Sequence, residues 1–278
     1  MKILVVSAHP EPRSLNASLA RFAVDHLREA GHEVRVSDLY AMKWKATVDA
    51  DDFPDEFPGA FSDKSSADFP AKSSAEFSDD QGRLHVMAAS ERATLAGRLS
   101  PDIAEEQEKV RWADAIVLQF PLWWFSVPAI LKGWIDRVFT AGFAYGPAVP
   151  PPYSNGPLAG KRALVSVTAG ARAGAFSDRG IHGELTDVLH PLQHGLFWFT
   201  GMAPLEPFAM YETNALPEER FEEARQAYAA RLDRLFTDEP VPYRTLVGGD
   251  YDHDMRLLPD VEEPGTTGLA LHTHPSGR

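Results

Sequence analysis

Asp114-Ala115-Ile116-Val117-Leu118-Gln119-Phe120, followed directly by Pro121-Leu122-Trp123-Trp124-Phe125, is the stretch that decides the fold class. Its first part is almost continuously apolar, which predicts a strand buried on both faces of a sheet. Its second part places three aromatic side chains in succession where that strand ends. Successive side chains on extended backbone point to opposite faces. The three aromatics therefore favour a wall for a flat ring over packing entirely within the core.

Strands and helices alternate outward from this stretch in both directions. Apolar runs predict further strands over 3–6, 32–37 and 162–168, and a fifth over 203–208. Apolar residues at helical spacing predict helices that start after Ser14 or Asn16 and after Ser100, and others over 128–139, 183–199 and 217–236. This alternation predicts a doubly wound α/β fold with a five-stranded parallel sheet.

An acidic insertion interrupts the alternation at about residues 50–82. An octad that starts at Phe61 is repeated from Phe69, and Phe77 begins a partial third copy. Two or three copies of so short a unit cannot form a repeat-protein core, and the polar composition favours a duplicated surface loop. The phenylalanines at 53, 57, 61, 69 and 77 leave open an alternative, in which the segment docks on a partner.

The composition limits the chemistry and the partners. The 278 residues contain no cysteine, which excludes disulfides, thiolate metal sites and thiol catalysis, so redox chemistry needs a bound cofactor. We predict no metal site. The net charge of −13 disfavours nucleic acid and anionic membrane surfaces. The apolar run 3–6 is too short for a signal peptide and the uncharged run 191–205 too short for a membrane span, so we expect a cytoplasmic protein without membrane insertion.

Three loops that follow predicted strands carry groups that suit one ligand, because ligands of open α/β sheets bind beyond the carboxyl ends of the strands. The loop 9–16 places Ser14 and free N–H groups at a helix amino terminus, which suits an anion although no glycine fingerprint is present. The loop 122–125 supplies the aromatic side chains, and the loop 168–171 supplies a glycine-containing backbone. A phosphate site, an aromatic wall and a backbone cradle together match a flavin.

The same segments resemble the NAD(P)H:quinone oxidoreductases of the DT-diaphorase type. The most specific motif is the run from Gln119 to Trp134, and shorter matches lie in order at 8–16, 37–42, 99–103, 143–145, 180–183 and 268–269. The resemblance covers nearly the whole chain except the acidic insertion. It implies a flavodoxin-like domain over 1–238, with a C-terminal extension over 239–278 that belongs to the same domain or to a dimer interface.

The resemblance also implies a homodimer with a flavin, FAD or alternatively FMN, at each subunit interface. The phosphate contacts would come from His9, Ser14, Leu15 and Asn16. The flavin ring would lie among Pro121, Leu122, Trp123, Trp124, Phe125, Thr168, Ala169, Gly170 and Ala171. The quinone pocket would include Ala144, Tyr145 and Gly146. His182 matches the family's catalytic histidine, which would offset the charge that builds on the flavin's pyrimidine carbonyl during reduction.

The sequence departs from the family pattern at several of these positions. Phe176 stands where the family has a catalytic tyrosine, and Pro147 stands where it has a second tyrosine of the substrate pocket. Trp123 replaces a glutamine, and the loop that should read Thr-Thr-Gly-Gly reads Thr168-Ala169-Gly170-Ala171. These changes leave the expected fold and flavin site intact and affect the expected substrate and proton route.

The activity implied by the resemblance is the two-electron reduction of a small-molecule quinone by NAD(P)H in a ping-pong cycle. The nicotinamide passes hydride to the flavin and leaves, and the quinone then takes the same place and receives the hydride. Two alternatives remain open at this point. The protein could be a non-catalytic flavin protein, regulatory or electron-carrying, or it could reduce azo or nitro compounds at the same site.

Overall fold

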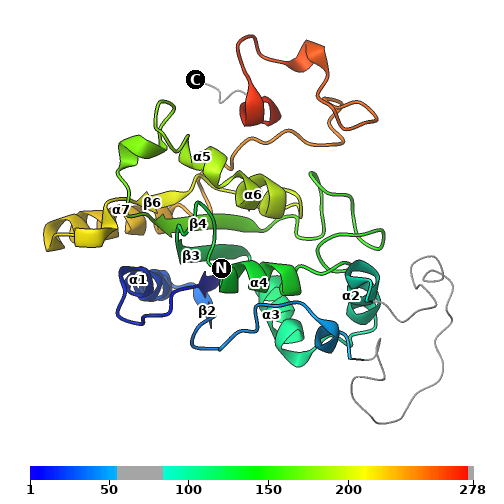
Figure 1. Cartoon of the computed structure of the whole chain (residues 1–278), viewed down its shortest axis with the longest axis horizontal. Coiled ribbons are helices and arrows are strands. Elements are labelled where there is room, and N and C mark those ends of the chain that lie inside the picture. The colour runs from blue at the N-terminus through cyan, green and yellow to red at the C-terminus, as the bar shows by residue number, and fades with distance from the viewer. Residues whose placement is uncertain (55–83, 275–278) are drawn as a thin grey trace.

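The structure, a computed structural model of the chain, describes residues 1–54 and 84–274 (Figure 1). The octad repeat and nearly all of the predicted acidic insertion lie outside the described residues. No helix in the described ranges combines the length and the apolarity that a membrane crossing requires.

A parallel sheet with the strand order β2-β1-β3-β4-β5 forms the centre of the molecule. Its strands are β1 (Lys2–Ser7), β2 (Glu33–Asp38), β3 (Ala115–Pro121), β4 (Arg162–Thr168) and β5 (Ala203–Pro204). The stretch that the sequence analysis singled out is the central strand β3, in which every residue is buried. The strand order reverses between β1 and β3, as the doubly wound prediction requires, and the predicted fold class is confirmed.

The fifth strand differs from its prediction, since it is divided in two. β5 pairs with the start of β4, and a further strand, β6 (Phe208–Met210), pairs with the end of β4 at Ser166 to Thr168. Pro204 and Pro207 flank the interruption, and a proline cannot donate a ladder hydrogen bond. The polypeptide still reaches the carboxyl edge of the sheet, where Met210 accepts a hydrogen bond from the Ala169 N–H.

Helices cover both faces of the sheet. One face packs on α1 (Leu15–Glu29) and α7 (Glu218–Asp233), and the other packs on α3 (Pro101–Trp112) and α4 (Ala129–Val138). Alternate residues of one strand serve the two cores, because side chains of successive strand residues point to opposite faces. In β1, for example, Val5 belongs to the α1 side and Val6 to the α4 side.

The remaining helical segments are short, apart from α2 (Val86–Leu95), which the sequence analysis missed. The predicted helix 183–199 is broken into α5 (Leu185–Val188), α6 (His190–Leu192) and a π-helical turn, Gln193–Trp198. Pro191 lies in the first turn of α6, where its missing N–H costs no hydrogen bond. Single 3-10 turns are formed by Ala50–Asp52, Ala173–Phe176, Thr213–Ala215, Pro259–Val261 and Gly268–His272.

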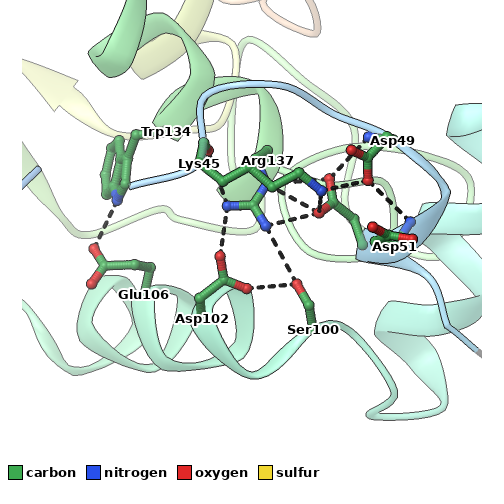
Figure 2. A network of polar contacts seen from close by, with 9 residues as sticks. Lys45, Asp49, Asp51, Ser100, Asp102, Glu106, Trp134 and Arg137 are labelled. Atoms are coloured by element: carbon green, nitrogen blue, oxygen red, sulfur yellow. Dashed lines mark hydrogen bonds and ion pairs between the residues drawn. The ribbon is translucent and has the colours of Figure 1, made fainter. Parts of the chain in front are cut away.

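The first residues of the predicted insertion belong to the folded core instead. Asp52 and Phe53 are 1% and 2% exposed, and Asp52 forms an ion pair with Arg137 of α4 at 2.8 Å. Figure 2 shows Arg137 among Lys45, Asp102 and Ser100, so that it joins the loop after β2 to α3. Burial of Phe53 removes it from the predicted row of docking phenylalanines.

The C-terminal segment, residues 241–274, packs beside α6 and the π-helical turn, and Figure 1 shows it in orange to red beyond α5 and α6. Its attachment is a group of aromatic rings around His194. The ring centroids of His194 and His190 lie 4.7 Å apart, and those of His194 and Tyr243 lie 4.9 Å apart. His272 extends the group and accepts or donates a hydrogen bond with the Tyr251 hydroxyl at 3.0 Å.

We expect acidification to loosen this attachment. Burial, followed by the neighbouring His190 and His272, lowers the pKa of His194 from about 6.5 to about 4. Between pH 6.5 and 4, His194 binds a proton when its ring is exposed to solvent but not when it is packed against the C-terminal segment. The contribution of this packing to stability is therefore complete above pH 6.5 and falls as the pH drops through this window. The protection factors of the amides in residues 241–274, which are corrected for the pH dependence of intrinsic amide exchange, should therefore decrease between pH 7 and pH 5. His194→Phe should flatten this pH dependence, whereas His253→Phe, which alters an 88% exposed side chain, should leave it unchanged.

Candidate functional site

A cavity of about 330 Å³ lies at the carboxyl edge of the sheet, at the point where the strand order reverses. This is the position at which ligands of open α/β sheets bind. Nine residues predicted to bind a cofactor line the cavity: His9, Ser14, Leu15, Asn16, Pro121, Leu122, Trp123, Thr168 and Gly170. The remaining lining residues, Thr213 and Asn214, come from the loop after β6.

The amino terminus of α1 forms one end of the cavity. Ser14 is the N-cap, and its hydroxyl accepts a hydrogen bond from the Ala17 N–H at 3.1 Å. The first N–H groups of a helix have no carbonyl partner within the helix, so those of Leu15 and Asn16 face the cavity side of this terminus. The helix dipole adds a partial positive charge there. This end of the cavity can hold a phosphate.

Buried hydrogen bonds join three strand ends beneath the cavity. Asn16 donates to the Thr168 hydroxyl at 2.6 Å and accepts from Gln119 at 2.9 Å. Gln119 in turn accepts from the Ser166 hydroxyl at 2.7 Å. All the side chains that form these hydrogen bonds are buried. A buried polar network whose hydrogen bonds are all satisfied restricts the geometry of its side chains. The network therefore fixes the loops of β1, β3 and β4 relative to one another.

The turn after β3 holds its aromatic residues in an unusual backbone conformation. Trp123 and Ser126 exchange both backbone hydrogen bonds, and the residues between them, Trp124 and Phe125, have φ values of 50° and 60°. A positive φ is costly for bulky side chains, and such strain gathers at functional sites. The turn separates the three aromatics: Trp123 lines the cavity, Trp124 is 94% exposed, and Phe125 turns toward the 173–183 loop. The predicted single aromatic wall is thus divided in two.

Phe125, Phe176 and His182 form a cluster of rings beside the cavity. The His182 ring centroid lies 5.0 Å from those of both Phe125 and Phe176. Phe176 is buried and also contacts Tyr211. The loop that carries His182 closes at Gly180, where a Cβ atom would lie 2.3 Å from the Ala175 carbonyl oxygen. The structure thereby brings the predicted histidine, the phenylalanine at the tyrosine position and one predicted aromatic together.

The predicted backbone cradle, Thr168 to Ala171, is only partly available to a ligand. The Ala169 N–H already donates to the Met210 carbonyl at 2.8 Å. Gly170 remains in the cavity wall, and a Cβ there would lie 2.7 Å from the Asn214 side chain. The Asn214 side chain would have to move to admit a larger residue at this position. Sequence reasoning missed Asn214 and Thr213, because a loop after a short, interrupted strand gives no periodic signal.

The predicted quinone residues Ala144, Tyr145 and Gly146 lie at the opposite, amino edge of the sheet. The residues just before them contact the second half of α3 (Pro101–Trp112), the half that leads into the start of β3. The Thr140 hydroxyl accepts a hydrogen bond from Gln107, and the guanidinium of Arg111 lies over the ring of Phe143. A seven-residue strand separates the two edges by about 20 Å. One chain therefore does not bring these residues to the cavity.

A larger cavity, about 530 Å³, lies between α1 and the edge strand β2 and shares His9 and Asn16 with the first. Its wall along α1 is charged, with Arg21, Asp25 and Arg28. Neither a tryptophan nor a phenylalanine lines it. Tyr40 lines the larger cavity, whereas the smaller cavity combines a tryptophan, a glycine and the amino terminus of α1.

Comparison with known proteins places this site in a family. A family model described as "Flavodoxin-like fold" matches residues 1–235. The chain is 39% identical to the ribosyldihydronicotinamide dehydrogenase-like protein traD of Penicillium crustosum, over 98% of this chain and 96% of that one. It is 38% identical to NAD(P)H dehydrogenase [quinone] 1 of Cavia porcellus, over 86% of this chain and 79% of that one.

A solved structure is similar over almost its whole length. The crystal structure of a candidate quinone reductase from Klebsiella pneumoniae is 44% identical, with a TM-score of 0.86 over 99% of this chain and 100% of that one. Both the family match and these identities extend across every element that forms the cavity. The chain therefore belongs to the flavodoxin-like family and, within it, to the NAD(P)H:quinone oxidoreductases that its sequence motifs indicate.

Proposed function

We propose that this chain reduces quinones with NAD(P)H through a flavin bound in the 330 Å³ cavity, in a ping-pong cycle. The observation that carries the proposal is the composition of that cavity, where a helix amino terminus, an aromatic side chain and a glycine meet at the reversal of strand order. The names of the relatives, NAD(P)H dehydrogenase [quinone] and quinone reductase, support the same reaction.

The residues of the cavity fit a flavin. The amino terminus of α1 would hold the phosphate, and Leu122, Trp123 and Gly170 would enclose the ring between a side-chain wall and a backbone wall. The bound flavin would supply the acceptance and donation of hydride. His182 would place a ring N–H beside the cofactor, and Phe176 would orient that histidine through ring contact. We propose FAD as the cofactor, with FMN as the alternative.

We further propose that the working unit is a homodimer. In one chain, Tyr145 and its neighbours lie about 20 Å from the cavity, at the other edge of the sheet. A second copy could present its 144–146 loop to the cavity of the first. Trp124 and Ile181, which are 94% and 91% exposed at the cavity end of the molecule, would then be covered. The segment after residue 238 would belong to the same domain, given its contacts with α6, and we expect the protein to work in the cytoplasm.

Trp124 provides a test of the cofactor site. Trp124 does not line the cavity of one chain and is 94% exposed, so its ring is free to be covered by a bound flavin. In that case an alanine at this position should weaken flavin binding by about tenfold to a hundredfold, because stacking adds to the burial of a large aromatic side chain. The matched control is Trp112→Ala, since Trp112 lies at the amino edge of the sheet beneath Arg35. Fluorescence titration of the flavin-free protein measures both variants. Equal losses in the two variants would remove Trp124 from the site.

Steady-state kinetics and the mass of the extracted chromophore test the proposed function. NADH, NADPH and ribosyldihydronicotinamide should be compared as reductants, since the last is part of a relative's name. We expect a simple quinone to sustain oxidation of at least one of them, and the mass to distinguish FAD from FMN. A tightly bound flavin with no turnover would favour a regulatory or electron-carrying protein, and turnover with azo or nitro compounds alone would favour those substrates.

A further inference from the structure

The 141–146 loop is a closed turn built to present Tyr145. The Gly142 N–H donates to the Tyr145 carbonyl at 2.8 Å, and Gly142 and Gly146 have φ values of 78° and 107°. These are left-handed values that favour glycine. The Thr140 hydroxyl at the base of the turn hydrogen-bonds to the Thr94 hydroxyl of α2 at 2.8 Å. The turn is therefore held from below by α2, the helix that the sequence analysis did not predict.

Glu91 of α2 points its carboxylate at this turn. Its Oε1 atom is buried, and none of the described residues forms a hydrogen bond with it. A Cβ atom at Gly146 would lie 3.3 Å from that oxygen, so the glycine leaves the room that the carboxylate occupies. Burial, followed by the charge of Glu91, raises the pKa of the Tyr145 hydroxyl. The carboxylate is thus electrostatically coupled to the residue that the turn presents.

Among the described residues, no hydrogen-bond donor reaches the buried Oε1 of Glu91. Arg111 lies over the Phe143 ring of the same loop and donates to the neutral amide of Gln107 at 3.1 Å, but Glu91 is the charge that acts on the Tyr145 hydroxyl. Burial of an uncompensated charge is costly, and its field is less screened than that of a solvated one. Any group that approaches Tyr145 from outside therefore meets a negative potential.

We propose that Glu91 determines substrate charge selectivity: it makes the Tyr145 side of the acceptor pocket electronegative, so that neutral quinones are preferred over anionic ones. The inference rests on the proposed function, in which the 144–146 loop of one copy completes the acceptor pocket of another. Glu91 acts through space, by its charge, and takes no part in hydride transfer. Its effect should therefore fall on KM for a charged acceptor, with kcat unchanged.

The experiment compares two acceptors and three forms of the dimeric, flavin-loaded protein. The acceptors are 2-methyl-1,4-naphthoquinone, which is neutral, and 1,2-naphthoquinone-4-sulfonate, which is an anion. The forms are the parent, Glu91→Gln and Glu105→Gln, the last removing an exposed carboxylate of α3 that is paired with Lys109. Glutamine keeps the size of Glu91 and removes its charge. For each form, the ratio of kcat/KM for the anion to kcat/KM for the neutral quinone is measured.

We expect Glu91→Gln to raise this ratio by about threefold to tenfold, the effect of one charge several ångströms away across a partly screened protein edge. The rise should appear in KM for the anion, and Glu105→Gln should leave the ratio within about twofold of the parent. Raising the salt concentration should increase the ratio of the parent more than that of Glu91→Gln. Glu91→Ser, which is also neutral and has a smaller side chain, tests the proposal in the same way if Glu91→Gln fails to fold.

Two failures are distinguishable. If the parent reduces neither quinone, the proposed function is wrong. If the parent reduces both, and neutralising Glu91 leaves the ratio within about twofold of the parent, quinone reduction stands and the assignment to Glu91 is overturned.

Discussion

Replacing Arg137 with methionine is expected to lower the free energy of unfolding by about 3–5 kcal/mol. Arg137 is 2% exposed, and Figure 2 shows its guanidinium beside Asp102 and Lys45. The guanidinium also pairs with Asp52 and lies 4.5 Å from the centroid of the Trp44 ring. Methionine would fill much of the volume but leave the buried Asp52 carboxylate with Lys45, at 3.1 Å, as its remaining ion-pair partner. The penalty comes chiefly from this under-compensated buried charge.

The control for this loss lies on the same helix. Lys132 of α4 forms an exposed ion pair with Asp136 at 2.6 Å, and Lys132→Met should cost less than about 1 kcal/mol. Adding Asp52→Asn to Arg137→Met should recover part of the stability, because the buried carboxylate that has lost Arg137 is made neutral. Urea unfolding followed by circular dichroism measures all three. Equal losses for Arg137→Met and Lys132→Met would show that the network contributes little.

Replacing His182 with glutamine is expected to slow reduction of the bound flavin by one to three orders of magnitude, about the effect of losing one positioned donor. The centroid of the His182 ring lies 5.0 Å from those of Phe125 and Phe176. The side chain is only half-buried at the cavity end of the molecule, so a bound flavin could reach it. Stopped-flow reduction by NADH measures the rate directly. A parent-like rate would make His182 a structural residue of the 173–183 loop.

Phe176→Tyr is the companion variant, because it restores the hydroxyl that the family resemblance expects. Phe176 is buried against His182 and Tyr211, and a tyrosine ring has the same outline. We expect flavin binding to be retained and reduction by NADH to be unchanged or faster. Slower reduction would show that the apolar ring itself is required for the orientation of His182.

The sequence predicted the elements that local pattern determines. The buried run before Pro121 became the central strand, and Ser14 became the cap of α1 because its hydroxyl can satisfy a first-turn N–H. The predicted cofactor loops converge because the carboxyl ends of parallel strands share one edge. Residues such as Asn16, Leu122 and Gly170 could therefore be proposed from their place after a strand alone.

What the sequence did not predict depends on tertiary contacts. Trp44 lies in the loop after β2, yet it is buried beneath Arg137, a contact between positions about ninety residues apart. The helix α2 follows the low-complexity stretch and has weak apolar periodicity, so its pattern gave no signal. The positive φ values of Trp124 and Phe125 could not be foreseen either, because bulky residues rarely adopt them.

Anaerobic mixing of the purified protein with NADH, followed by addition of 2-methyl-1,4-naphthoquinone, tests the central claim most directly. The flavin absorbance near its visible maximum is followed throughout. We expect it to disappear on reduction by NADH without any quinone present, and to return when quinone is added, with one quinone consumed per flavin. A flavin that neither NADH, NADPH nor ribosyldihydronicotinamide reduces, or a reduced flavin that quinone fails to reoxidise, would contradict the account.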